Sequence, residues 1–214
     1  VAKVRRVAGG TKTGHAGTLD PLATGVLPVA LGEATKTMAF AMDGRKRYRF
    51  AVRFGEQRDT DDAEGAVVAE SAARPTRAAI EAVLPCFCGA IEQVPPAFSA
   101  IKVGGRRAYA LARAHEPIAL APRAVTVDAI ALIDYPCADH AEFEVAAGKG
   151  VYMRSLARDL ALACGTVGHI AWLRRLAVGP FTEAAALPLA HIEALASPDA
   201  LSPLLLPVSA ALAD

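Results

Sequence analysis

The sequence predicts a mixed α+β protein in which strands and helices alternate along the chain. Three observations indicate this class. Hydrophobic residues make up 53% of the 214 residues, which is ample for a packed core in one large domain or in one domain with an appendage. Residues 45–54 alternate apolar and basic side chains with the period of a strand. Helix-like segments such as residues 76–84 are interleaved with such strands, which agrees with an α+β class without fixing the sheet.

The first elements are short and surround a glycine-rich stretch. Residues 1–8 carry valines among basic side chains, as at the end of an amphipathic helix. Residues 26–31 are expected to form a buried strand, and residues 33–42 a helix opened by Gly32. The glycine-rich residues 9–14 do not form a phosphate-binding loop, because the G-x-x-x-x-G-K-[ST] pattern is absent.

The clearest strand spans residues 45–54. Tyr48, Phe50, Val52 and Phe54 lie on one expected face, and basic residues dominate the other. On pattern alone, Tyr48 is a core aromatic residue with its hydroxyl group at an edge. The other expected elements are helices at residues 76–84, 106–114, 156–164, 188–196 and 198–205, and strands at residues 123–134 and 142–147.

Residues 55–65 form an acidic, polar segment. Asp59, Asp61 and Asp62 have the composition of a calcium-binding loop, but the glycine and the distal glutamate do not fit the EF-hand pattern. We therefore expect a solvated loop here.

Charge and cysteine content restrict the function classes. The net charge is +1, but several segments are net basic and could converge on one RNA-facing surface; an ordinary mixed surface remains the alternative. Those segments are residues 1–15, 45–53, 102–113 and 149–175. No long apolar run or signal segment is present, and the four cysteines form no C-x-x-C pair or zinc-ligand spacing. We expect reduced cysteines, no membrane segment, no metal, no cofactor and a cytoplasmic protein.

One carboxylate stands out in the N-terminal region. Asp20 is the first acidic residue of the chain, lies in a glycine-rich, base-flanked stretch and directly precedes Pro21. The proline disfavours helix for Asp20, so its side chain is expected to project from a loop. A surface turn would use the same residue types, and spacing alone favours that interpretation.

The residues around Asp20 change this weighting. The string from residue 15 to residue 27, HAGTLDPLATGVL, resembles the active-site motif of the TruB family of tRNA pseudouridine-55 synthases. The similarity continues through GEATK at residues 32–36, KRY at 46–48, QVPPAFSAIK at 93–102, GKGVYMRSL at 148–156 and LRRL at 173–176. These segments occur in the family's order and span most of the chain up to Phe181.

The resemblance implies a fold and a set of site residues. The fold would be a pseudouridine synthase fold, a mixed and largely antiparallel sheet flanked by helices. Asp20 would be the catalytic nucleophile, Arg154 its charge partner and Tyr48 the residue that stacks on the target base. The resemblance implies four further substrate contacts. His15 would fill the space left by the flipped nucleotide, Tyr152 and Leu173 would line the pocket, and Lys102 would contact phosphate.

The implied reaction converts a uridine in the T-arm loop of tRNA to pseudouridine by a base-flipping mechanism. We expect a monomer that needs no cofactor. A guide-RNA-dependent synthase subunit shares the T-L-D-P string, and an RNA-folding chaperone or inactive binding module is a rival of another class. We expect a catalytic domain over residues 1–181, with its N-terminal segment missing, and a helical extension over residues 182–214 without the RNA-binding C-terminal module.

Overall fold

The chain folds into two compact units. The computed structural model describes residues 1–114, 116, 119–195 and 197–212. One unit comprises Val1–Arg47 and Arg174–Asp214, and the other Tyr48–Leu173. Both boundaries fall inside strands, β4 (Lys46–Phe54) and β12 (Gly168–Val178).

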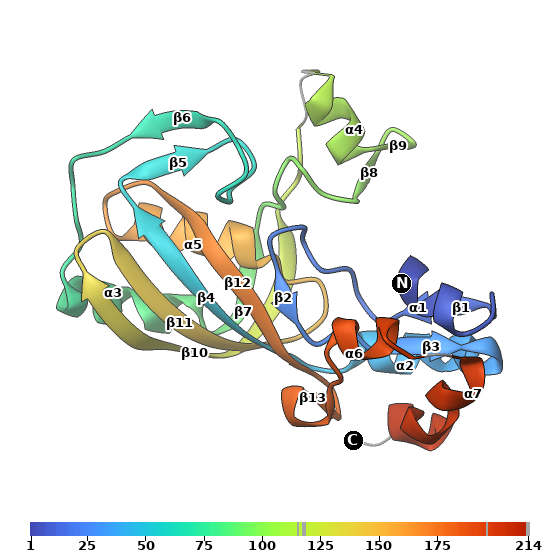
Figure 1. The fold of residues 1–214 in the computed structure, drawn as a ribbon. Coiled ribbons are helices and arrows are strands. Elements are labelled where there is room, and N and C mark those ends of the chain that lie inside the picture. Colours follow the sequence, from blue (N-terminus) through green and yellow to red (C-terminus); the bar gives the residue numbers. More distant parts are fainter. Residues whose placement is uncertain (115, 117–118, 196, 213–214) are drawn as a thin grey trace. The chain divides into compact units, whose positions relative to one another are not determined.

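The Tyr48–Leu173 unit is built on a sheet with the strand order β12–β4–β11–β10–β7 (Figure 1). Its other strands are β7 (Gly89–Gln93), β10 (Arg123–Cys137) and β11 (His140–Ala147). β10 pairs antiparallel with both β11 and β7. The long strand β10, next to the edge strand β7, therefore has antiparallel neighbours on both sides.

Alternating side chains give this sheet one buried face. Every second residue of β11 is buried, and Phe50, Val52 and Phe54 of β4 are at most 1% exposed. The rings of Phe50 and Phe143 stack with centroids 5.5 Å apart. This confirms the strand expected at residues 45–54, and burial of such side chains is the main favourable term in folding.

Two helices of this unit contact each other, α3 (Arg77–Val83) and α5 (Met153–Ala163), and Figure 1 shows α5 running along the sheet. The α5 helix approaches β12 closely, because a Cβ atom at Gly168 would lie 2.8 Å from Cβ of Ala161. Thr76 caps α3 by accepting a hydrogen bond from the amide of Ala79.

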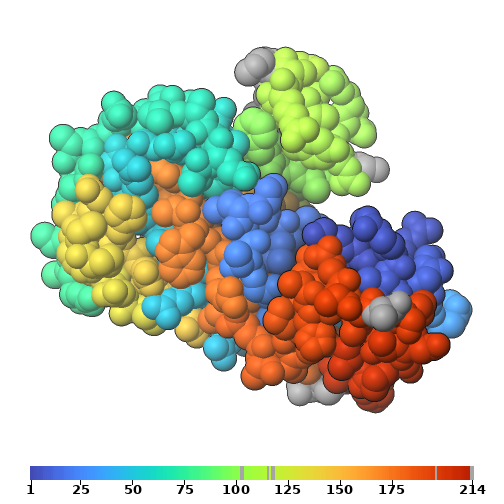
Figure 2. Space-filling model, in the orientation of Figure 1, coloured from blue at the N-terminus to red at the C-terminus, as the bar shows by residue number. Residues whose placement is uncertain are grey.

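Two smaller hairpins complete the unit. One pairs β5 (Glu56–Arg58) with β6 (Val67–Glu70), and the other pairs β8 (Lys102–Val103) with β9 (Arg106–Arg107). β9 leads directly into helix α4 (Ala108–Arg113). Figure 2 shows this last segment, in light green, as a knob that stands away from the rest of its unit.

The other unit consists of short elements. Its helices and strands are α1 (Ala2–Val7), β1 (Thr13–His15), β2 (Thr24–Gly25), β3 (Val29–Leu31), α2 (Met38–Asp43), β13 (Phe181–Thr182), α6 (Leu189–Glu193) and α7 (Pro198–Leu201). Its 3₁₀ turns are η1 (Gly32–Thr37), η3 (Glu183–Ala185), η4 (Ser202–Leu204) and η5 (Val208–Leu212), whereas η2 (Leu84–Phe87) belongs to the sheet unit. Ala16, Ala41 and Val178 form a small buried cluster, against which Met38 and Phe181 pack.

The α+β class and the mixed, mostly antiparallel sheet are confirmed. Several local expectations were wrong. The buried strand expected at residues 26–31 is present only as the half-buried β3, and the helix expected at residues 198–205 divides into α7 and the 3₁₀ turn η4. The helix expected at residues 33–42 divides into the 3₁₀ turn η1 and the α-helix α2. The segment expected to be a solvated loop contains strand β5, and Asp61 and Asp62 are only 5% and 3% exposed, because arginine side chains pair with them. Within the described residues, no helix is long and apolar enough to span a membrane.

Candidate active site

Asp20 lies in a loop that closes a two-stranded hairpin. β1 pairs antiparallel with β3, with His15 opposite Val29. Just beyond this pair, the amide of Ala16 donates a hydrogen bond of 3.0 Å to the carbonyl oxygen of Pro28. The loop therefore begins and ends at this pair of residues. Asp20 lies within the loop, in neither a helix nor a strand, as the proline that follows it predicts.

The far side of this loop is fixed to β12. β2 pairs in parallel with β12, with Thr24 opposite Arg174 and Gly25 opposite Arg175. The amide of Val26 donates to the carbonyl oxygen of Arg175 at 2.8 Å. Gly25 has φ +98°, and a Cβ atom there would lie 2.1 Å from that carbonyl oxygen. Only glycine allows the loop backbone to approach the strand this closely.

His15 ends β1 at the base of the loop. Its ring is half-buried, and the Nδ1 atom is buried without a hydrogen-bond partner among the described residues. A buried polar atom that lacks a partner is costly, so such an atom at a loop is a candidate ligand contact.

Arg154 lies in the first turn of α5, in the sheet unit, and is 5% exposed. Its two terminal nitrogens donate to the carbonyl oxygens of Thr60 and Phe98, each at 3.0 Å. Nη1 also lies 3.7 Å from Oδ2 of Asp62. These contacts hold the guanidinium group in one orientation at the start of the helix.

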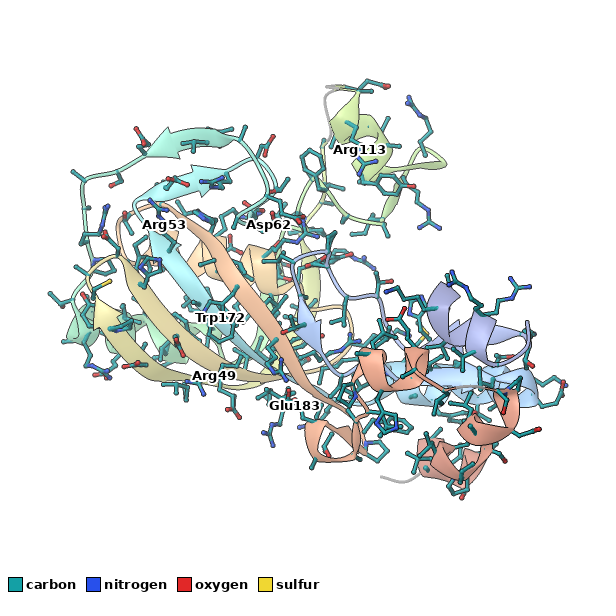
Figure 3. All side chains as sticks on the ribbon, in the orientation of Figure 1. Arg49, Arg53, Asp62, Arg113, Trp172 and Glu183 are labelled. Atoms are coloured by element: carbon teal, nitrogen blue, oxygen red, sulfur yellow. The ribbon has the colours of Figure 1, made fainter. Side chains whose placement is uncertain are left out.

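Two buried carboxylates follow each other opposite α5. Asp62 accepts hydrogen bonds from the Thr60 hydroxyl and from the amide of Glu64, and Figure 3 shows it in the loop after β5. Asp61 pairs at 2.9 Å with Arg158, one helical turn beyond Arg154. Burial raises the pKa of Asp61 to about 6, although Arg158 beside it acts in the opposite direction. The sequence signal was the run of acids at 59–62, which was interpreted as a solvated cluster.

A glutamine side chain fixes the residue that precedes α5. The amide of Tyr152 donates to Oε1 of Gln93 at 2.8 Å, and Nε2 of Gln93 donates back to the Tyr152 carbonyl oxygen at 3.1 Å. The Ser155 hydroxyl donates to the Val94 carbonyl oxygen at 2.7 Å. The end of β7 therefore holds the start of α5, and no sequence pattern singled out Gln93 or Ser155 for this role.

The other predicted residues lie on strands. Tyr48 is half-buried at one end of the apolar face of β4, and Leu173 is 4% exposed on the neighbouring strand β12. Lys102 belongs to β8, but its side chain lies outside the described part of the structure.

The predicted site residues fall into two groups. Tyr152 and Arg154 share the start of α5, and Tyr48 and Leu173 lie on adjacent strands of the same unit. Asp20 and His15 belong to the other unit, on the loop of the β1–β3 hairpin. That these groups form one catalytic site is part of the function proposed below.

Comparison with solved structures shows the fold class first. The chain is similar to the crystal structure of a Cbf5–Nop10–Gar1 complex, with a TM-score of 0.71 and 26% identity over 98% of this chain and 56% of that one. It is also similar to the archaeal box H/ACA sRNP Nop10–Cbf5 complex, with a TM-score of 0.71 and 24% identity over 99% and 55% of the two chains. The second likeness is a likeness of fold alone.

Comparison of sequences then shows the family. Residues 5–153 match the TruB family pseudouridylate synthase (N terminal domain), and residues 154–213 match the tRNA pseudouridylate synthase B C-terminal domain. The proteins named tRNA pseudouridine synthase B from Gluconacetobacter diazotrophicus and Nitrobacter winogradskyi are 59% and 55% identical to the whole of this chain. The chain belongs to the TruB family.

The chain spans 70% and 61% of the length of these two relatives. The two family matches meet at residues 153 and 154, whereas residues 182–214 share a compact unit with residues 1–47. The domain boundary expected at residue 181 stays a prediction.

Proposed function

We propose that this chain isomerises one uridine in the T-arm loop of tRNA, at position 55, to pseudouridine. The observation that carries the proposal is the 59% identity over the whole chain to a relative named tRNA pseudouridine synthase B. Two features of the chain support it: a glycine-rich loop that presents one carboxylate, and a buried, oriented arginine. The main rival, a guide-RNA-dependent subunit, is disfavoured by the names of these relatives.

The reaction needs an ionised carboxylate and a closed pocket. The bond between N1 of uracil and C1′ of ribose breaks, the base turns, and C5 joins C1′ while the C5 hydrogen leaves as a proton. Asp20 is the catalytic carboxylate: it attacks C1′ or the uracil ring as a nucleophile, or it removes a ribose proton as a base. Arg154 is the charge partner of Asp20 and orients its carboxylate, because the planar guanidinium donors match a carboxylate.

The remaining residues hold the substrate. Tyr48 stacks on the target base, and Tyr152 and Leu173 line the pocket. A base in a folded loop must first leave its stack, which costs a few kcal/mol, and His15 fills the vacated space. The unpartnered Nδ1 atom of His15 supports this role. Lys102 contacts phosphate, and such contacts weaken as salt concentration rises.

The test is tritium release from C5-labelled uridine in a T-arm stem-loop RNA without any guide RNA. The wild-type chain is expected to release tritium, and Asp20→Asn is expected to bind the RNA equally well but release none. Asp134→Asn is the matched control, because Asp134 is exposed and accepts a hydrogen bond only from the adjacent amide of Tyr135 among the described contacts.

Each other outcome has a definite meaning. Near wild-type release by Asp20→Asn would refute the role of Asp20. Binding without release by either protein would favour a guide-dependent subunit or a binding module, and release restored by a guide RNA would separate these two. A monomer in the cytoplasm remains the expected state, which size-exclusion chromatography with light scattering and cell fractionation would check.

A further inference from the structure

Arg175 is the largest of the fully buried side chains in the described part of the chain, at 1% exposed. Its guanidinium group donates three hydrogen bonds, all to backbone carbonyl oxygens. Nε donates to Val26 at 2.8 Å, Nη2 to Gly17 at 3.1 Å and Nη1 to Thr18 at 3.4 Å. Among the described residues, no carboxylate forms an ion pair with Arg175. The charge is therefore buried in a cage of backbone oxygens.

These acceptors lie on both sides of Asp20 in the sequence. Gly17 and Thr18 precede it by three and two residues, and Val26 follows it by six. The loop has two arms, one before Asp20 and one after it. The planar guanidinium group of Arg175 ties these two arms to each other and to β12. The backbone of Arg175 adds the bond from the Val26 amide. No other contact described for this loop connects both arms through a single side chain.

The preceding arginine has a different environment. The Arg174 side chain is 49% exposed and pairs with Glu183, and its Nη1 reaches the Thr24 hydroxyl at 3.3 Å. It touches one arm of the loop only, through an exposed polar contact. Exposed ion pairs of this kind contribute little to stability. The two arginines are therefore neighbours in the sequence, but the Arg175 side chain is buried and the Arg174 side chain is exposed.

We propose that Arg175 is a positioning residue that sets the geometry of the loop and thereby the placement of the Asp20 carboxylate. Arg175 contacts neither the Asp20 carboxylate nor any substrate group in the described contacts, so it acts through the backbone it holds. The inference rests on the proposed role of Asp20. Because a misplacement of about 1 Å can cost about 100-fold in rate, loosening the arms should lower kcat far more than RNA affinity.

The experiment compares Arg175→Met and Arg175→Lys with Arg174→Met and Arg174→Lys as matched controls. Methionine is unbranched and donates no hydrogen bond, whereas lysine keeps the charge but cannot reproduce the planar fork. Three quantities are measured in each folded variant: single-turnover tritium release at saturating T-arm RNA, the Kd for that RNA, and amide hydrogen exchange. Exchange is followed in peptides covering residues 15–28, with residues 140–147 of β11 as the internal reference.

For Arg175→Met we expect about 100-fold slower turnover, a Kd within about threefold of wild type, and faster exchange in residues 15–28 alone. The turnover and the exchange rate of Arg175→Lys should fall between those of Arg175→Met and wild type. One ammonium group can replace some, but not all, of the hydrogen bonds to the backbone oxygens. Both Arg174 variants should retain kcat within about threefold.

The proposal is overturned if folded Arg175→Met keeps near wild-type turnover, or if turnover falls while exchange of residues 15–28 stays unchanged. Should Arg175→Met not fold, Arg175→Lys decides by the same two criteria. If the wild-type chain releases no tritium, the proposed function fails. The exchange comparison then still shows whether Arg175 holds the loop.

Discussion

Replacing Gln93 tests how the start of α5 is held. Gln93 is 2% exposed and forms two hydrogen bonds with the backbone of Tyr152, at 2.8 and 3.1 Å. Gln93→Met keeps a similar volume but removes both hydrogen bonds. The Tyr152 amide loses this acceptor, whereas the Tyr152 carbonyl oxygen still accepts from the Leu156 amide at 3.0 Å. An unsatisfied buried group costs about 1–3 kcal/mol, so we expect a loss of about 1–3 kcal/mol in the free energy of unfolding.

The loss should be visible in both stability and activity. For a chain of this length, about 1–3 kcal/mol corresponds to a fall in Tm of roughly 2–12 °C. Because Tyr152 precedes Arg154 by two residues, kcat for tritium release should also fall, with little change in the Kd for RNA. Glu92→Met is the matched control, because Glu92 is the exposed neighbouring residue on the same strand, β7.

Urea unfolding and differential scanning calorimetry of the three proteins give the magnitudes. The reasoning would be refuted if Gln93→Met lost less than about 0.5 kcal/mol, which is the range of an ordinary surface substitution. It would also be refuted if Glu92→Met were as unstable as Gln93→Met, since the loss would then not depend on the buried hydrogen bonds of Gln93.

Two further predictions concern charged groups in the same unit. Asp62→Asn should lower kcat at least about tenfold, or about 1.4 kcal/mol in the barrier, because it removes the carboxylate that lies 3.7 Å from Arg154. The control is Asp59→Asn, at an exposed position, which should not lower kcat. Equal tritium release by both variants would contradict this prediction. Burial lowers the pKa of His169 below its usual value, so the neutral ring stabilises the fold above about pH 6.5 and this contribution is lost as the pH falls through the lowered pKa. Urea unfolding between pH 5 and pH 7.5 should show a weaker acid-side loss in His169→Gln than in wild type or exposed His191→Gln, and identical slopes would exclude His169 as the cause.

The sequence predicted those parts of the fold in which the spacing of apolar side chains is compatible with only one kind of element and one buried face. The alternation along residues 45–54 marks a strand with one apolar face, and β4 has that face buried. The segment at residues 33–42 was harder to predict, because a 3₁₀ turn and an α-helix share similar side-chain spacing over so few residues. Strand order was outside the reach of periodicity, since pairing between β12 and β4 joins residues far apart in the chain.

The candidate site was predictable mainly through resemblance. Asp20, Arg154 and Tyr48 were found because their neighbours match family motifs, and their roles stay predictions. Asp62 was missed because a cluster of acids with no apolar spacing looks like a solvated surface. Its burial depends on Arg154, which lies more than 90 residues later in the sequence. The role of Gln93 likewise appears only when the end of β7 meets the start of α5.

Two buried arginines, one in each compact unit, share one feature of their hydrogen bonding. Arg154 and Arg175 are 5% and 1% exposed, and each donates hydrogen bonds to backbone carbonyl oxygens of two chain segments. Carbonyl oxygens satisfy N–H groups without neutralising the charge, so Arg175 can orient its loop and still contribute a positive potential, whereas Arg154 also lies 3.7 Å from Asp62. A lysine would retain that potential but lose the fork of donors that fixes two chain segments at once. This hydrogen bonding therefore requires arginine at both positions for geometric reasons, and charge alone in the sequence could not have distinguished Arg175 from Arg174.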